Sequence, residues 1–356
     1  MIHQTTITQS VMEIPKTPWD SLCAQHPFAQ HRWLHLLEAT LAHYEPHYIQ
    51  IEQGDRLVAG AICNLKRTFR MSAYLDNPII SQLSGMFFKH VPPMYCGVPI
   101  FSLPGFIIHP EEDAQIWQPH LLTAIEQLTK QEGTLMAGFD CLDRNGRTAL
   151  LAQQEFFEVP IVPESYIDIQ WDSFEAYQEA LPKKSRSEMR RVRNRAVEQG
   201  ITIDAVPLSP ELSPIVAQLT QNVAERHGNT HPYKPNFITK AIPILRPQDY
   251  RFLLIRQDGD IIGCAALFQC AGEVVVKWGG FDYPRTEPTF AYHYLLTETV
   301  RHAIEMKAKR LTMGMTVYTI KKKLGAVLED RFLLMHMRIR PLNYLANYFL
   351  NRHQEN

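Results

Sequence analysis

The densest group of chemically useful side chains is a basic run in the second half of the chain. Between Lys183 and Arg195 there are seven basic residues and one acidic residue, Glu188, so the local charge is +6, whereas the whole chain has a formal net charge of −1. Cations gathered in this way can bind phosphate, in tRNA, in a nucleotide-linked acceptor or in an anionic lipid. The alternative is a solvated helix that pairs with acidic neighbours. The candidates for phosphate binding are Lys183, Arg186, Arg190 and Arg191.

A second polar segment, residues 225–233, contains two histidines four residues apart, at His227 and His231. A glycine, an asparagine and a proline in this segment argue against the helix that would place both imidazoles on one face, so we expect no metal site there. The chain also lacks the GxSxG, P-loop, GxGxxG and HExxH motifs. Hydrolase, kinase and dehydrogenase functions therefore have no support.

Composition and length are those of an ordinary folded protein. The 356 residues are 45% hydrophobic and 21% charged, and a chain of this length predicts about two domains. Six cysteines without CxxC spacing predict reduced thiols and no zinc site. No signal peptide is visible, and no apolar run approaches the ~20 residues of a spanning helix, so we expect a cytoplasmic protein. The near-neutral total charge predicts no DNA partner.

Hydrophobic periodicity alternates between helix and strand along the chain, which predicts an α/β protein with mixed, α+β-type sheets. The expected helices cover residues 31–43, 113–131, 174–181, 184–199, 210–226, 237–244 and 288–309. The clearest expected strands cover residues 48–53, 57–64, 203–206, 250–256, 260–269, 274–279 and 310–315. In the basic helix, one stripe can pack down and leave the cations on the remaining arc; it comprises Ser185, Met189, Val192 and Ala196.

Two strand pairs are similar to one another, which indicates an internal duplication. Residues 51–61 parallel residues 255–265: each is an extended segment, a Gly/Asp turn, and a second extended segment ending in small residues. Further strands, a long helix and another strand follow each pair in the same order.

This order of elements resembles the acyltransferase fold of the GNAT superfamily, and its duplication resembles the double-GNAT proteins of the FemABX type. The family's leucine and basic helix are matched by Leu181 and the basic run, and its lysine with a glycine four residues later by Lys321 and Gly325. The resemblance implies two tandem GNAT-like domains. We place them at residues 1–164, a degenerate copy, and 165–340, the acyltransferase copy, followed by a C-terminal helix or tail at 341–356.

The resemblance implies that Lys321 lies where the oxyanion of a tetrahedral intermediate forms, which a cation stabilises during acyl transfer. Lys322 and Lys323 are the adjacent candidates for contact with the donor. The alternative is that three consecutive lysines point in three directions and at most one faces the site.

Attack by an amine also requires a group that removes its proton. Asp282 follows the strand at 274–280, near the place where GNAT-like strands separate. Tyr292, His293 and Tyr318 are the other candidates, with Tyr318 as a possible acid for the leaving group. Tyr292 lies on an otherwise apolar helix, where packing in the core is the alternative role.

The acyl donor is left open by one departure from the GNAT pattern. GNAT enzymes bind the pyrophosphate of CoA on a Q/R-x-x-G-x-G/A loop with free backbone N–H groups, but residues 282–292 contain no glycine, and Pro284 and Pro288 remove two donors. FemABX enzymes instead transfer an aminoacyl group from tRNA to a peptidoglycan precursor. We therefore expect acyl-CoA or aminoacyl-tRNA as a co-substrate and no tightly bound cofactor.

The leading hypothesis is a bacterial N-acyltransferase that passes an acyl or aminoacyl group to an amine acceptor, such as a cell-envelope precursor. By resemblance, Arg226 or His227 contacts the acceptor. The alternative is a degenerate, non-catalytic GNAT pair that binds a nucleotide, a lipid or a protein. The expected C-terminal helix at 341–352 docks on the body of the protein or, through nearby arginines, touches the anionic inner face of the membrane.

Overall fold

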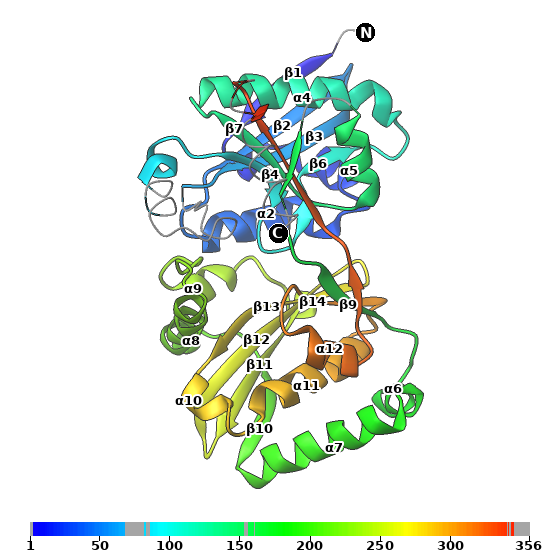
Figure 1. Cartoon of the computed structure of the whole chain (residues 1–356), viewed down its shortest axis with the longest axis vertical. Coiled ribbons are helices and arrows are strands. Elements are labelled where there is room, and N and C mark those ends of the chain that lie inside the picture. The colour runs from blue at the N-terminus through cyan, green and yellow to red at the C-terminus, as the bar shows by residue number, and fades with distance from the viewer. Residues whose placement is uncertain are drawn as a thin grey trace. The chain divides into compact units, whose positions relative to one another are not determined.

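The computed structural model of the chain describes residues 3–67, 82, 86–152, 156–159, 161–339, 341 and 343–344. The chain forms two compact units. Unit 1 comprises the residues up to Glu38, residues 43–161 and the segment from Asp330 onward, and unit 2 comprises residues 39–42 and 162–329 (Figure 1). The second domain therefore ends at Glu329 rather than at 340 as the sequence suggested. The predicted C-terminal helix lies largely outside the described residues.

Unit 1 is built on one mixed sheet with the strand order β1-β2-β3-β4-β7-β16-β8, to which β5 and β6 add at β4 and β3. Its strands are β1 (Gln4–Thr8), β2 (Pro46–Gln53), β3 (Arg56–Leu65), β4 (Met94–Val98), β5 (Leu103–Pro104), β6 (Phe106–Ile108), β7 (Met136–Leu142), β8 (Phe157–Val159) and β16 (Phe332–Met337). Its helices are η1 (Val11–Glu13), α1 (Lys16–Leu22), η2 (Pro27–Ala29), α2 (His31–Thr40), α4 (Ala114–Gln131) and α5 (Arg144–Leu151). The core lies between the sheet and the apolar face of α4, which buries Leu121 and Ile125.

Unit 2 is built on a second mixed sheet with the order β10-β11-β12-β13-β14-β9-β15. Its strands are β9 (Glu164–Asp168), β10 (Ile201–Val206), β11 (Tyr250–Gln257), β12 (Asp260–Cys270), β13 (Glu273–Phe281), β14 (Arg310–Gly314) and β15 (Val327–Glu329). Its helices are α6 (Phe174–Ala180), α7 (Lys183–Glu198), η4 (Pro210–Leu212), α8 (Ser213–Arg226), α9 (Phe237–Ala241), η5 (Pro247–Asp249), α10 (Tyr283–Thr286), α11 (Ala291–Glu305) and α12 (Tyr318–Lys323). Helices α6, α7 and α11 pack on the sheet in one core.

The basic helix α7 lies as its periodicity predicted. Met189 and Val192 are each 6% exposed and Ala196 is fully buried, whereas most of the cations are exposed. Burial of this narrow apolar stripe holds the helix on the unit although most of its side chains are charged.

The two sheets repeat one pattern, which confirms the duplicated hairpins. Among the described residues, each sheet has one parallel strand pair, β4 with β7 and β13 with β14, among antiparallel neighbours. The first hairpins match even in their irregularity, because the register shifts between Ile51 and Glu52 in one copy and between Ile255 and Arg256 in the other. The expected fold class, an α/β chain of two similar domains with mixed sheets, is confirmed.

The two sheets exchange one strand each. β8 pairs in the sheet of unit 1, but the next strand along the chain, β9, lies between β14 and β15 in the sheet of unit 2. In the same way β15 belongs to unit 2, and the next strand, β16, lies between β7 and β8 in unit 1. Each sheet therefore contains one strand that the chain forms only after it has left the other unit. This strand is β16 in unit 1 and β9 in unit 2.

The exchange predicts where a mutation late in the chain acts. Leu334 on β16 is fully buried in the core of unit 1. Leu334→Ala should lower the free energy of unfolding by about 3 kcal/mol because it leaves a cavity. Hydrogen exchange followed by mass spectrometry should show the loss of protection in peptides from β7 and β8. A loss centred on β14 and β15 would contradict the exchange.

Candidate functional site

The strands β13 and β14 run parallel but stay paired for only three residues. Glu273, Val274 and Val275 pair with Arg310, Leu311 and Thr312, and no further pair follows. β13 continues to Phe281 alongside β12, with a bulge at which Trp278 adopts a positive φ of +51°. Beyond Thr312, β14 therefore no longer pairs with β13, and this unpaired part of the strand is called the open end of β14.

Lys321 lies at this opening and is almost completely buried. Its side chain is 2% exposed, and its Nζ donates to the carbonyl of Gly314 at 3.1 Å. The Ser165 hydroxyl donates to the same carbonyl at 2.5 Å. Gly314 ends β14 with a φ of +82°, a conformation that other residues rarely adopt. The fold therefore delivers one ammonium group to the open end of the strand.

Two charges act on Lys321 besides its burial. Desolvation first, and the charge of Lys277 next, lower the pKa of the Lys321 amine, whereas the charge of Glu164 raises it; the net result is a pKa of about 8. The last pair between β13 and β14 joins Val275 to Thr312. Lys277 follows Val275 by two residues, and Gly314 follows Thr312 by two residues. This register places Lys277 at the mouth of the opening.

Tyr318, one turn before Lys321, is held by the backbone. Its hydroxyl lies 2.6 Å from the carbonyl oxygen of Pro163 and 2.7 Å from that of Met315. Burial and the charge of Glu164 raise the pKa of Tyr318. The hydroxyl proton is thus engaged with carbonyl groups, and Tyr318 fixes α12 against the start of β9.

The three adjacent lysines have three different surroundings. Lys321 is buried, Lys322 is exposed, and the Nζ of Lys323 donates to Glu188 Oε1 of α7 at 2.8 Å. A helix turns about 100° per residue, so neighbouring side chains cannot share one direction. Only Lys321 points to the open end of β14.

A second cluster of charges joins α7, α11 and α12. Glu188 accepts from Lys323 and lies 3.8 Å from Arg191, and the Lys323 hydrogen bond lowers the pKa of the Glu188 carboxyl. His293, half-buried on α11, is near the same groups, and its pKa is lowered by burial first and by Lys323 next. The Glu188 carboxylate therefore lies near several basic side chains, and the cluster carries a net positive charge.

Asp282 and Tyr292 lie at the far end of β13, beyond its last pair with β14. Asp282 follows β13 five residues after Lys277, a distance of about 16 Å along an extended strand. Tyr292 packs edge-on against Phe281, with ring centroids 5.2 Å apart, and burial raises its pKa to about 12. The structure thus favours the core-packing role for Tyr292.

The cations of α7 divide into structural and exposed ones. Arg186 donates to the carbonyls of Glu179 and Leu181, at 2.8 and 3.0 Å, and so closes the C-terminal end of α6. Exposed cations of α7 with neither a carboxylate nor an aromatic partner in the described part of the chain are Lys183, Lys184, Arg190 and Arg193, whereas Arg195 lies over the ring of Phe290. These four, unlike Arg186, are available to a phosphate-bearing partner.

Arg226 and His227 end α8 on the surface. Arg226 pairs with Glu287 at 2.7 Å and lies over the ring of Tyr283 at 4.2 Å, and His227 is exposed. The Arg226 guanidinium is thereby tied to the segment that precedes α11. The Nε2 of His231 lies within hydrogen-bond distance of the Thr220 hydroxyl, at 2.9 Å.

Three residues at the opening received no role from the sequence: Glu164, Ser165 and Lys277. Glu164 and Ser165 are 4% and 0% exposed and arrive on the exchanged strand β9. Their polarity within a short strand was the available signal, but nothing local indicated that this strand pairs with β14.

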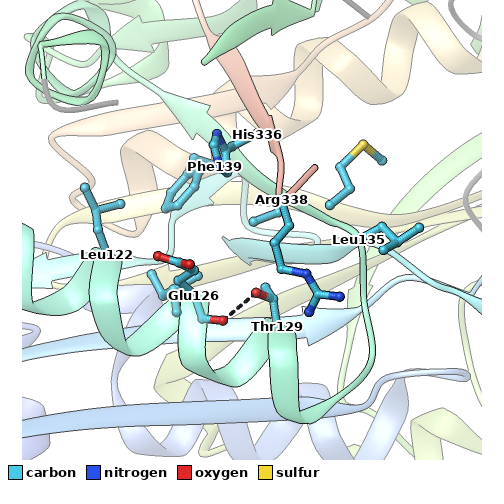
Figure 2. A pocket seen from close by; sticks show the side chains of 10 residues that line it. Leu122, Glu126, Thr129, Leu135, Phe139, His336 and Arg338 are labelled. Carbon is cyan, nitrogen blue, oxygen red and sulfur yellow. Dashed lines mark hydrogen bonds between the residues drawn. The ribbon is translucent and has the colours of Figure 1, made fainter. Parts of the chain in front are cut away.

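Other features of the described residues are limited. No group of three or more metal-ligating side chains occurs among them. No helix within the described ranges is both long and apolar enough to span a membrane. Unit 1 has a small surface pocket of about 20 Å³ between α4, β7 and β16, where the side chain of Arg338 extends toward Thr129 (Figure 2).

Comparison with protein families decides the assignment. Residues 10–316 match a protein-family model named FemAB-like and described as peptidoglycan biosynthesis/recognition. The chain belongs to the FemAB-like family. The match includes α7 and β13 and ends before α12, so it does not extend to Lys321. A search of curated proteins gives no match.

Solved structures resemble this FemAB-like chain over almost its whole length. FemX matches with a TM-score of 0.62 at 12% identity, covering 97% of this chain and 100% of its own. A tandem GNAT protein from the clavulanic acid biosynthesis pathway matches with a TM-score of 0.59 at 11% identity, covering 94% and 98%. L-PGS from Bacillus licheniformis matches with a TM-score of 0.56 at 11% identity, covering 97% and 98%. These likenesses establish the tandem GNAT fold.

The lowered pKa of Lys321 predicts a pH-dependent cost to folding. The unfolded chain, in which lysine has a pKa of about 10.4, holds the proton more tightly than the folded one, so the cost is complete below pH 8 and disappears as the pH rises through 10.5. Relative to the wild type, Lys321→Met should raise the free energy of unfolding at pH 7 by up to about 3 kcal/mol, and by less as the pH rises.

Urea unfolding at several pH values measures this difference. Lys322→Met, at the exposed neighbouring position, is the matched control and should show no such trend. A difference for Lys321→Met that is the same at pH 7 and pH 10 would show that the amine is not held at a lowered pKa.

Proposed function

We propose that this FemAB-like chain is an N-acyltransferase that moves an acyl or aminoacyl group from an activated donor to an amine of a cell-envelope precursor. The observation that carries the proposal is the buried ammonium of Lys321 at the open end of β14. Family membership supports the same conclusion, because the family is described by peptidoglycan biosynthesis/recognition.

The chemistry requires attack of the acceptor amine on the carbonyl carbon of the donor. The carbonyl oxygen becomes an oxyanion in the tetrahedral intermediate, and a positioned cation stabilises it most strongly where water is excluded. Lys321 meets both conditions, since it is charged below about pH 8 and its side chain is 2% exposed. Collapse of the intermediate then expels the donor's leaving group and leaves a new amide bond.

The charge distribution favours aminoacyl-tRNA as the donor. The exposed cations of α7 and the Glu188–Lys323–Arg191 cluster lie on the same unit as Lys321 and can bind a phosphate backbone. The place of the GNAT pyrophosphate loop is filled instead by α10, with Pro284 in its first turn and without a glycine. Binding of acyl-CoA in the usual manner is therefore the less favoured alternative.

The role of Lys321 predicts a large loss of activity on substitution. Lys321→Ala should lower the rate of transfer by about 100-fold or more, because a single oxyanion-stabilising group contributes this much. The assay follows a radiolabelled amino acid from charged tRNA to a nucleotide-linked peptidoglycan precursor. Lys322→Ala is the control and should keep most of the activity. Full activity of Lys321→Ala would refute the assignment.

The role of α7 predicts salt-dependent binding to tRNA. The double variant Arg190→Ala/Arg193→Ala should weaken binding and reduce the slope of log affinity against log salt by about 1 to 2, as expected for two lost phosphate contacts. Lys240→Ala/Arg251→Ala removes two exposed cations of unit 2 outside α7 and is the matched control. Equal effects of both double variants, or no binding of any donor by the wild type, would favour the non-catalytic alternative.

A further inference from the structure

Two side chains from different elements donate to one backbone carbonyl at the open end of β14. The hydroxyl oxygen of Ser165 lies 2.5 Å from the Gly314 oxygen, and the Nζ of Lys321 lies 3.1 Å from the same oxygen. A carbonyl oxygen has two lone pairs and can accept both donors at once. The hydroxyl contact is short for its kind and the ammonium contact is long for its kind. Ser165, which is 0% exposed, therefore has the tighter hold on the carbonyl.

The Gly314 carbonyl depends on such a hold because its backbone is weakly constrained. Gly314 has a φ of +82°, and glycine restricts the rotation of a peptide group less than any other residue. The register of β9 against β14 shifts between Thr312 and Gly314, so the ladder is irregular just before this carbonyl. The next carbonyl, that of Met315, accepts from the Tyr318 hydroxyl. Side chains therefore help to fix the backbone to which Lys321 is bonded.

The direction of this carbonyl sets the direction of the ammonium group. Lys321 makes one hydrogen bond to the described part of the chain, although an ammonium has three hydrogens to donate. The bond to Gly314 places the nitrogen, and the two remaining hydrogens can be donated to an oxyanion. Rotation of the Gly314 peptide group would consequently turn these two hydrogens away from their target.

The two sheets can be aligned at this place by their strand pairing. In each sheet the parallel pair ends at one residue of the central strand, which is Phe139 on β7 and Thr312 on β14. The antiparallel partners of these residues are Leu334 on β16 and Tyr166 on β9, and a register shift lies beside each pair. The pair Phe139–Leu334 in unit 1 is therefore equivalent to Thr312–Tyr166 in unit 2.

This alignment shows that the sheet itself does not require the hydroxyl. Leu333 stands in unit 1 where unit 2 has Ser165, and it is 2% exposed. The helix after the central strand differs as well, since its fourth residue is Arg147 in unit 1 and Lys321 in unit 2. Arg147 is 35% exposed and pairs with Glu158. The buried hydroxyl and the buried ammonium thus belong to the same copy, and both point to its chemistry.

We propose that Ser165 is a positioning residue for the transfer reaction, whose hydroxyl fixes the Gly314 carbonyl and, through it, the ammonium of Lys321. The inference rests on the proposed function, because it gives Ser165 a part in the stabilisation of the oxyanion by this lysine. Ser165 touches neither donor nor acceptor in this scheme. It acts through a backbone carbonyl, and it does so from the exchanged strand β9.

The first test follows the Lys321 amine without any substrate. Competitive labelling of the full-length protein with acetic anhydride between pH 6 and pH 11, with quantification of the Lys321 peptide by mass spectrometry, gives the midpoint at which the amine becomes reactive. The wild-type midpoint should lie near pH 8. Ser165→Ala should lower it by about half a unit to one unit, as expected when one hydrogen bond to the charged amine is weakened.

The charges that act on the amine are the same in the wild type and in Ser165→Ala. They are those of Lys277 on β13 and Glu164 on β9. On the helix of Lys321 itself, Lys323 is paired with Glu188 of α7. A lower midpoint in Ser165→Ala therefore reports the hydrogen bond and not a change of charge.

The matched control removes another buried hydroxyl of unit 2. Thr299 on α11 is 0% exposed and donates to the Leu296 carbonyl at 2.7 Å. Thr299→Val deletes this hydrogen bond with little change of shape and should leave the Lys321 midpoint unchanged. An unchanged or higher midpoint in Ser165→Ala, or the same shift in Thr299→Val, would overturn the proposal.

The transfer assay separates positioning from general destabilisation. Ser165→Ala should lower kcat by about 10-fold or more and leave KM nearly unchanged, because a displaced lysine fails in the transition state. In a Lys321→Ala background the same substitution should lower kcat no further, since the hydroxyl acts only through the lysine. An equal loss in both backgrounds would mean a merely structural role and would contradict the proposal.

Failure of the proposed function gives a different pattern of results. If the labelling midpoint falls in Ser165→Ala but the wild type transfers no acyl group to any acceptor, the proposed function fails while the hold of Ser165 on the lysine stands. If the wild type is active but neither the midpoint nor kcat responds to Ser165→Ala, the proposed function stands and the positioning role is refuted.

Discussion

The structure depends on placing one ammonium group where water does not reach it. A lysine that is 2% exposed loses most of its hydration, and within the described part of the chain the Gly314 carbonyl and the Glu164 charge favour its charged form. The cost appears as a pKa of about 8 instead of the usual value above 10. The short helix α12, the positive φ of Gly314 and the early separation of β13 from β14 all serve this placement.

Duplication gives the protein two copies of one scaffold, of which only unit 2 has the buried lysine. Both copies conserve the hairpin with its shifted register, the single parallel pair and the helix that follows. They differ at the end of the central strand, where unit 1 has Arg147 over Phe332 and unit 2 has the buried lysine. The two copies thus share the strand pairing that forms the sheet. They differ at the end of the central strand, where the proposed chemistry would occur.

Most of the fold could be predicted from the sequence because its signals are local. The turns at 54–55 and 258–259, the stripe of Met189, Val192 and Ala196, and the lysine four residues before Gly325 all lie within short windows. Pairing between distant segments could not be predicted in this way. Asp282 was expected near the site because it follows the correct strand, but the sequence did not indicate that β13 extends for six residues beyond its last pair with β14.

The residues missed at the site share the same cause. Ser165 precedes its partner Gly314 by 149 residues, and the strand that carries Ser165 and Glu164 reaches β14 only through a strand exchange. Lys277 lies on a predicted strand, yet its neighbour across the opening depends on the register of a parallel pair. The periodicity of a strand gives the face of a side chain and not its partner on the next strand.

The strand exchange also constrains how the protein can be made. Ribosomes release a chain from its N-terminus, and domains generally fold in that order as they emerge. β16 follows every element of unit 2 in the chain, so the gap between β7 and β8 stays open until unit 2 has been synthesised. During that interval the exposed edges of β7 and β8 are available for pairing with other extended segments. Correct biogenesis therefore couples completion of the first sheet to the synthesis of the last strand.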